Sequence, residues 1–330
     1  MHMSDALVSP TVAAVAGAAS LVLLGTAVRK LRPVRSRLHT DALHSERIVP
    51  LMGVMGAFVF AAQMINFAVP GTGSSGHIVG GILLSAILGP WAALLALSSV
   101  LILQCLLFAD GGFLALGCNI FNMAVLSCLV AYPLVFRPLM RPDATPGRIF
   151  AASVLASVAG LELGALAVTL ETEASAITAL PIGKFLLFML PIHLAIGIGE
   201  GLATGALLCA VRRYRPELLA GTEPQEQPAK RRFVRTLAAI AVAALLVGGS
   251  FSWLASSQPD GLEWSLSRTA GTAEMAPAPD DLHRTAAAIQ ETTAALPDYG
   301  TTTAGLVGCG VLLLAAWGGT QLLRTRRKGA

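Results

Sequence analysis

Two histidines, one at position 2 and one in a glycine-framed loop, could bind a metal ion together with the start of the chain. If Met1 keeps a free amine, the Met1 amine nitrogen, the deprotonated His2 amide nitrogen and the His2 imidazole Nδ1 form fused five- and six-membered chelate rings. The imidazole of His77, in "GTGSSGHIVGG", would complete a planar set of four nitrogen donors. Among divalent metals this geometry is typical of Ni(II) or Cu(II), whereas Zn(II) prefers a tetrahedron. Met1, His2 and His77 are therefore the predicted metal ligands.

The loop around His77 has the glycine spacing of a phosphate-binding loop but lacks its chemistry. Gly71 and Gly76 are spaced as in G-x-x-x-x-G-K-[ST], yet His77 and Ile78 stand where Lys and Ser/Thr must hold the phosphates and magnesium. Glycines also let a backbone approach another segment closely. We therefore expect this loop to bring His77 inward, toward the N-terminus, and not to bind a nucleotide.

Nine apolar segments must position these residues. Hydrophobic residues make up 55% of the 330 and charged residues only 13%, which is far outside the range of soluble proteins. Most segments are near the ~20 residues that span the hydrocarbon core, and they alternate too little for barrel strands. They are 11–28, 48–69, 78–89, 91–109, 114–136, 147–170, 184–211, 236–255 and 304–323, the third being short. The sequence predicts an all-α polytopic membrane protein.

Basic residues indicate how the chain is oriented. Twenty of the 23 Lys and Arg residues lie in four segments, which are 29–47, 137–148, 212–235 and 324–328. Nine crossings place all four on one face, which the positive-inside rule assigns to the cytoplasm. The N-terminus is then outside and the C-terminus cytoplasmic. The first apolar segment follows no positive n-region, so we expect no cleaved signal peptide and a free Met1 amine outside the membrane.

Five polar residues are candidates for supporting or gating the metal site. His193 and Glu200 are seven residues apart in one segment and so share a helix face, where ionisable groups at membrane depth are costly enough to suggest function. They could equally form a structural hydrogen-bonded pair. Asn119, in another segment, could bond between helices or contact the site. Ser74 and Ser75 share the loop with His77.

The polar stretch "YRPELLAGTEPQEQPAKRR" separates seven segments from two. It predicts a metal-binding module at 1–215, a cytoplasmic linker at 216–235 and a two-helix accessory module at 236–330. The loop 256–303 between the last two segments carries seven acidic residues and two arginines. It begins with "SQPDGLEW", whose Pro, Asp and Gly residues are typical of turns. In it, "DDLHRTAAAIQETTAAL" predicts a short surface helix with an aspartate cap, on which His283 would be solvated.

Several motifs in this order resemble one family of membrane proteins. "MH…SP", "SSGH…GG", "LLFADGGFLALGCNIFNMA" and "PIHLAIGIGEGLATG" look like the nickel/cobalt-specific substrate-capture component of energy-coupling factor (ECF) transporters, the CbiM/NikM family. "PDGLEW", between the last two apolar segments, resembles the small two-helix partner of that family, fused in one chain. The resemblance covers nearly all of the sequence. One departure is Met3, which replaces a small aliphatic residue.

The resemblance implies a function, a site and partners. It implies a seven-helix module that captures Ni²⁺ or Co²⁺ as cargo, with no resident cofactor, through the Met1 amine, the His2 amide and imidazole, and His77. It also implies a transmembrane coupling (T) component and two cytoplasmic ATPase subunits, in a bacterial or archaeal plasma membrane. The planar chelate favours nickel. The sequence has no Walker motif, so we expect a transporter subunit and not an enzyme.

Alternatives to this interpretation remain. One is a self-sufficient, proton-coupled metal carrier that uses His193 and Glu200 as a proton relay. A less favoured one is an intramembrane metalloenzyme, since the sequence lacks H-E-x-x-H and a third clustered ligand. The net charge of +4 could suggest a nucleic-acid partner, but it follows from the basic cytoplasmic segments and suits contact with anionic lipid. We therefore expect the lipid bilayer, and no nucleic acid, as a partner.

Overall fold

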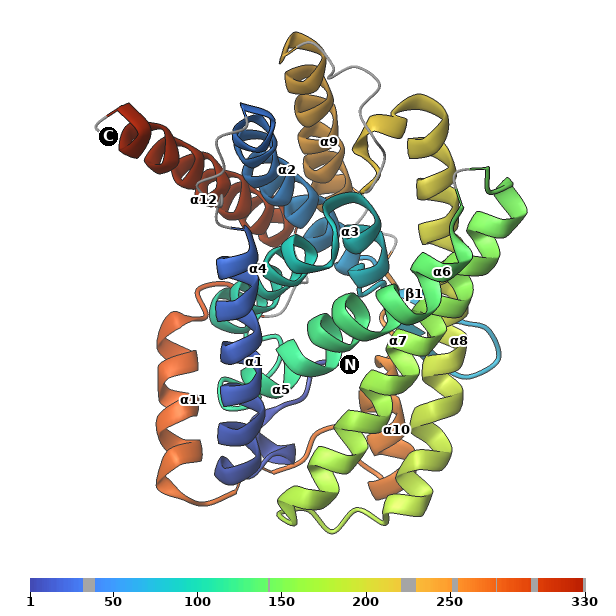
Figure 1. Ribbon diagram of the computed structural model, residues 1–330. Coiled ribbons are helices and arrows are strands. Elements are labelled where there is room, and N and C mark those ends of the chain that lie inside the picture. The colour runs from blue at the N-terminus through green and yellow to red at the C-terminus, as the bar shows by residue number, and fades with distance from the viewer. Residues whose placement is uncertain are drawn as a thin grey trace.

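The computed structural model describes residues 1–31, 39–141, 143–220, 230–250, 255–276, 278–297 and 302–328. Its long helices are packed side by side into a bundle, and the N-terminus lies within the bundle (Figure 1). The elements up to the first long central helix are η1 (Asp5–Leu7), α1 (Pro10–Leu31), α2 (His39–Gln63), β1 (Phe67–Val69), β2 (Ser74–Gly76), α3 (Gly81–Leu88) and α4 (Pro90–Phe108). They are followed by α5 (Leu116–Asn119), η2 (Ile120–Phe136), α6 (Arg137–Leu139), α7 (Pro146–Ser175), α8 (Ile182–Tyr214) and η3 (Pro216–Leu218). The last part of the chain forms α9 (Lys230–Ser250), α10 (Gly261–Ala270), α11 (Asp281–Thr293) and α12 (Thr302–Lys328).

The predicted fold class, an all-α polytopic membrane protein, is confirmed. Within the described residues, seven helices are long and apolar enough to cross a membrane. They are Pro10–Leu31, Pro90–Phe108, Leu116–Leu139, Pro146–Ser175, Ile182–Tyr214, Arg231–Ser250 and Thr303–Gln321. The third of these is a continuous rod made of α5, η2 and α6, in which η2 is wound as a wider π-helix. In α2, the apolar part runs from Arg47 to Gln63.

The predicted third span, 78–89, is not a full membrane helix. It contains α3, whose eight residues extend only about 12 Å, against the ~30 Å of a hydrocarbon core. The chain before α3 is irregular. Residues 74–76 and 79–80 are buried, while the turn of the small β1–β2 hairpin, which pairs Val69 to Ser74, is largely exposed. Irregular backbone at membrane depth is tolerated where protein surrounds it. At the other end of α3, the Ala220 amide, beyond α8, donates to the Ala86 carbonyl. A buried loop and a short helix therefore replace the expected regular span.

The last two long helices pack against the first part of the chain through α2. Helices α9 and α12 contact both α2 and each other. Cys309 of α12 is fully buried, and its thiol lies 3.5 Å from the Ala57 carbonyl oxygen of α2. Part of the predicted linker, 221–229, lies outside the described residues, so the predicted module boundaries stay a prediction.

The segment between α9 and α12 forms two helices on different sides of the N-terminal segment. In Figure 1, α10 lies beside α8 and α11 runs alongside α1. Helix α11 begins at an aspartate cap as predicted, because the Asp280 carboxylate accepts the amides of Leu282 and His283. His283 is only 2% exposed, so the expectation that it is solvated was wrong. Both helices therefore reach the region where the metal site is predicted.

Candidate metal site

The N-terminal residues are held inside the bundle by contacts to the backbone of residue 3. The Met3 amide donates to Asn119 Oδ1 at 2.7 Å, and Asn119 Nδ2 donates to the Met3 carbonyl at 3.1 Å. The Gly112 amide donates to the same carbonyl. A Cβ atom on Gly112 would collide with Asp5, so the turn after α4 needs glycine there. With residue 3 fixed in this way, Met1 and His2 have little freedom in where they lie.

The structure brings His2 and His77 together. Their ring centroids are 5.5 Å apart, with 50° between the ring planes. Burial and then the adjacent N-terminal ammonium lower the pKa of His2 to about 3 and that of His77 to about 4. Both rings are therefore neutral at physiological pH, which is the form that binds metals. His77 Nδ1 lies 3.1 Å from the Ile78 carbonyl oxygen, which it can bond only as a donor, so Nε2 carries the free lone pair.

Two carboxylates contact the atoms that the predicted chelate would use. His2 Nδ1 lies 3.4 Å from Asp110 Oδ1, while His2 Nε2 is buried without a hydrogen-bond partner. The Met1 ammonium donates to Asp260 Oδ2 at 2.6 Å. Burial alone would raise the pKa of Asp260, but the ammonium overcomes this and holds that pKa below its usual range. Metal binding at these nitrogens requires both contacts to be exchanged or rearranged.

Sequence analysis missed both Asp110 and Asp260 as members of this region. Asp110 lies in "ADGG" and Asp260 in "QPDG", and such sequences are typical of turns. The predicted topology places both aspartates on the same side of the membrane as the N-terminus. That shared side was the one sequence feature that could have indicated their proximity to Met1 and His2.

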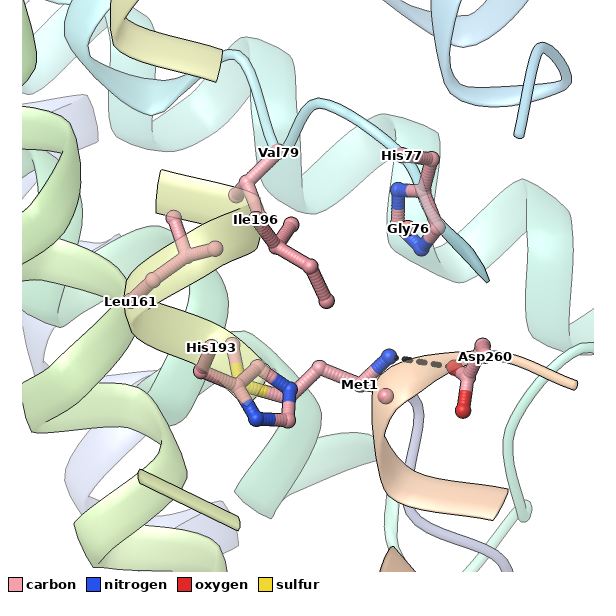
Figure 2. Close-up of a pocket in the computed structure, with 9 residues that line it drawn as sticks. Met1, Gly76, His77, Val79, Leu161, His193, Ile196 and Asp260 are labelled. Carbon is pink, nitrogen blue, oxygen red and sulfur yellow. Dashed lines mark hydrogen bonds and ion pairs between the residues drawn. The ribbon is translucent and has the colours of Figure 1, made fainter. Parts of the chain in front are cut away.

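A small cavity lies at the Met1 amine. Figure 2 shows His77, His193 and Asp260 around it, with Leu161 of α7 and Ile196 of α8 among the apolar lining. His193 Nδ1 lies 2.7 Å from the Met189 carbonyl oxygen and therefore donates to it. His193 Nε2 is consequently a lone-pair nitrogen, buried without a hydrogen-bond partner. The cavity thus joins the Met1 amine to two imidazoles and one carboxylate.

His193 and Glu200 do not form the hydrogen-bonded pair that their spacing allowed. Glu200 is 1% exposed, and its two carboxylate oxygens accept the amides of Val79 at 2.8 Å and Gly80 at 3.1 Å. These amides belong to the start of α3, where a negative group is favourable. Glu200 therefore fixes the loop that carries His77, while His193 faces the cavity.

Ser74 and Ser75 bind the segment before α10 and do not point to the histidines. The Ser75 amide donates to the Pro259 carbonyl at 2.8 Å, and its hydroxyl donates to the Gln258 carbonyl at 2.7 Å. The Ser74 hydroxyl lies 3.3 Å from the Pro259 carbonyl oxygen. The two serines join the His77 loop to the second module.

Side chains alone do not make a metal site in the described ranges. No three His, Cys, Asp or Glu side chains in this part of the chain are grouped so that they could hold a metal ion. The main-chain nitrogens nearest to His2 in sequence are the Met1 amine and the His2 amide.

Comparisons with known proteins agree with this architecture. A family model described as the cobalt uptake substrate-specific transmembrane region matches residues 2–218, and one described as the PDGLE domain matches 234–325. The fused nickel transport protein NikMN of Rhodobacter capsulatus is 32% identical over 74% of this chain and 71% of its own length. The cobalt transport protein CbiM of Sorangium cellulosum is 29% identical over 66% of this chain and 94% of its own.

A solved structure supports the same assignment. The crystal structure of a transition metal transporter superposes with a TM-score of 0.54 and 30% sequence identity, over 64% of this chain and 93% of that chain. The family consists of metal transport components, not of enzymes. The two family models also follow the order in which the sequence motifs occur. This chain belongs to the cobalt uptake substrate-specific transmembrane region family and carries a PDGLE domain after that region.

Proposed function

We propose that this chain captures Ni²⁺, or Co²⁺, as the substrate-specific membrane component of an ATP-driven ECF-type transporter. The observation that carries the proposal is the meeting of a buried N-terminus with the His2 and His77 rings, whose centroids are 5.5 Å apart. The metal ligands are the Met1 amine, the His2 amide nitrogen, His2 Nδ1 and His77 Nε2. A metal that enters displaces the protons of the amine and the amide, so binding releases protons.

The planar nitrogen set favours nickel over cobalt. Low-spin Ni(II) gains most from four coplanar nitrogen donors, and it is diamagnetic in that geometry. The similarity to a fused nickel transport protein, which extends over 74% of this chain, points in the same direction.

The energy source lies in other subunits. We place the N-terminus outside and the C-terminus in the cytoplasm, because the four basic segments then all face inward. A transmembrane coupling protein and two ATPase subunits would drive release to the cytoplasm. The self-sufficient carrier is less well supported, because both oxygens of Glu200 accept backbone amides and leave it poorly suited to relay protons to His193.

Metal binding to the purified chain tests the proposal. Mass spectrometry first verifies that Met1 is retained and unmodified. Titration calorimetry with Ni²⁺ and Co²⁺, together with metal analysis and an optical spectrum, then measures affinity and geometry. We expect one metal per chain, and for nickel a diamagnetic complex with weak visible d–d bands. A paramagnetic nickel complex would rule out the planar site, and failure to bind either metal would rule out the function.

A further inference from the structure

We propose that Asp260 of the PDGLE domain is the positioning residue for the Met1 amine, so that the second module completes the metal site. The inference rests on the proposed function and deepens it. Its starting point is the 2.6 Å contact between the Met1 amine nitrogen and Asp260 Oδ2, which joins residues 259 positions apart.

The two oxygens of Asp260 have different partners, which fixes the direction of the carboxylate. Oδ1 accepts the Glu263 amide at 2.8 Å and so caps the start of α10, while Oδ2 faces the amine. Glu263 in turn accepts the Asp260 amide at 3.0 Å, which completes a capping box. The carboxylate is therefore held ready by its own helix, whether or not the amine is present.

The segment that carries Asp260 is attached to the loop that carries His77. Besides the two bonds from Ser75, the Trp264 indole donates to the Thr72 carbonyl at 3.0 Å. Gly261 lets the segment come this close, because a Cβ atom there would lie 2.8 Å from Ile196 Cδ1 and 3.0 Å from His193 Cε1. One rigid unit thus holds both the amine and the fourth predicted ligand.

The positive charge beside Asp260 is the same before and after metal binding, so one carboxylate can neutralise it in both states. In the empty site the Met1 amine donates to Asp260 as an ammonium, which carries one positive charge. The loaded site holds a divalent metal and one deprotonated amide, which again leaves one positive charge. An unpaired buried charge is costly, and Asp260 balances it in both states. The metal-bound amine keeps N–H groups that can donate to Asp260, in the way that outer carboxylates orient metal ligands.

The test compares Asp260→Asn with Asp281→Asn in the full chain. Asparagine is as good a helix cap as aspartate, so α10 should stay formed while the charge beside the amine is lost. Asp281 is a matched control, because it lies in the first turn of α11 with a side chain that is 91% exposed. We expect Asp260→Asn to weaken Ni²⁺ binding in calorimetry about 10- to 100-fold, the range typical for loss of an outer partner of a metal ligand. Asp281→Asn should bind as the unaltered chain does.

Further measurements separate positioning from a purely structural role. Helix α10 should stay formed in the empty Asp260→Asn protein, with unchanged hydrogen exchange in residues 261–270, although the thermal midpoint should fall because the Met1 ammonium loses its partner. The d–d band of its saturated nickel complex should keep its wavelength, because all four nitrogen donors remain. Asp260→Glu, which keeps the charge, should recover most of the affinity.

Each adverse outcome has a distinct meaning. Unchanged affinity in Asp260→Asn, alongside weakened binding in His77→Ala, would overturn the role of Asp260 and leave the proposed function intact. A fall in affinity that Asp260→Glu does not recover, with faster hydrogen exchange in residues 261–270 of Asp260→Asn, would reduce Asp260 to a structural cap and overturn the inference. Absence of nickel and cobalt binding in the unaltered chain would instead contradict the proposed function itself.

Discussion

At the scale of single residues, the predicted ligands are positioned by neighbours that are not ligands. Asn119 pairs with both backbone groups of Met3, and Glu200 accepts two amides next to His77. Such bonds in a dry interior are costly to break, about 1–3 kcal/mol for each group left unpaired. The two sides of the site are therefore rigid before any metal arrives.

Removing the fourth donor should weaken the site without abolishing it. In His77→Ala the Met1 and His2 chelate remains, and water can take the open position in the plane. We expect weaker Ni²⁺ binding in calorimetry and a shifted d–d spectrum, because water is a weaker donor than imidazole. Affinity equal to that of the unaltered chain would remove His77 from the site.

Extending the N-terminus by one residue should abolish transport. The added residue turns the Met1 amine into an amide and moves the free amine away from Asp260. It also makes the histidine the third residue, where an amine, two amides and an imidazole could bind the metal without His77 and retain it. Cellular ⁶³Ni uptake at matched expression, with the partner subunits present, measures the effect.

The control for this experiment is an equal extension after Ala330, at the opposite end of the chain. We expect it to transport normally. Full uptake by the N-terminally extended protein, shown by mass spectrometry to be uncleaved, would mean that the amine does not bind the metal.

At the scale of elements, α11 packs across the N-terminal segment and contacts its backbone. His283 Nε2 lies 3.0 Å from the Asp5 carbonyl oxygen and 3.1 Å from that of Val8, and its Nδ1 lies 2.7 Å from Asp280 Oδ2. Two turns further along, Gln290 Nε2 donates to the Gly111 carbonyl at 2.7 Å. The helix therefore binds both the segment that follows the ligands and the turn that holds Met3.

Loss of the His283 contacts should loosen the N-terminal segment. In His283→Ala the carbonyl groups of Asp5 and Val8 lose their contact with the imidazole, so we expect faster hydrogen exchange in residues 3–9 and a lower thermal midpoint. Leu282→Ala is a suitable control, because Leu282 lies on the same turn and is 56% exposed. Equal exchange in the two variants would show that α11 does not restrain the segment.

The sequence could predict the helices but only part of the site. Long apolar runs predict membrane helices because the bilayer leaves the backbone no other way to satisfy its polar groups. The prediction of a regular membrane helix over 78–89 was wrong. Apolar composition alone does not distinguish residues that face lipid from residues that pack against other parts of the protein. Asp260 and His283 were missed for a related reason. Their roles depend on contacts across more than 250 positions of sequence, and local patterns carry no information about such contacts.

At the scale of the whole molecule, the two modules form a single assembly around the N-terminus. The second module holds α2 through its long helices and the metal region through α10 and α11. In the described part of the chain, therefore, the PDGLE domain contacts the N-terminal segment and the loop of His77 as well as packing in the bundle. The predicted cytoplasmic linker is consequently not the only connection between the modules.

Transport should need subunits beyond this chain. We expect the purified chain in vesicles to bind metal but not to move ⁶³Ni across the membrane under a pH gradient, and uptake to appear when the coupling and ATPase subunits are added with ATP. Proton-driven uptake by the chain alone would favour the self-sufficient carrier.

The contact between Met1 and Asp260 joins two residues that are made at different times during translation. The amine leaves the ribosome first, and its carboxylate follows 259 residues later. At roughly 5–20 residues per second, this delay is on the order of ten seconds or more. Even after His77 has been added, 183 more residues must follow before the carboxylate that contacts the amine is made. If Asp260 orients the Met1 amine, as we propose, a chain that ends before the PDGLE sequence should bind metal more weakly than the full chain.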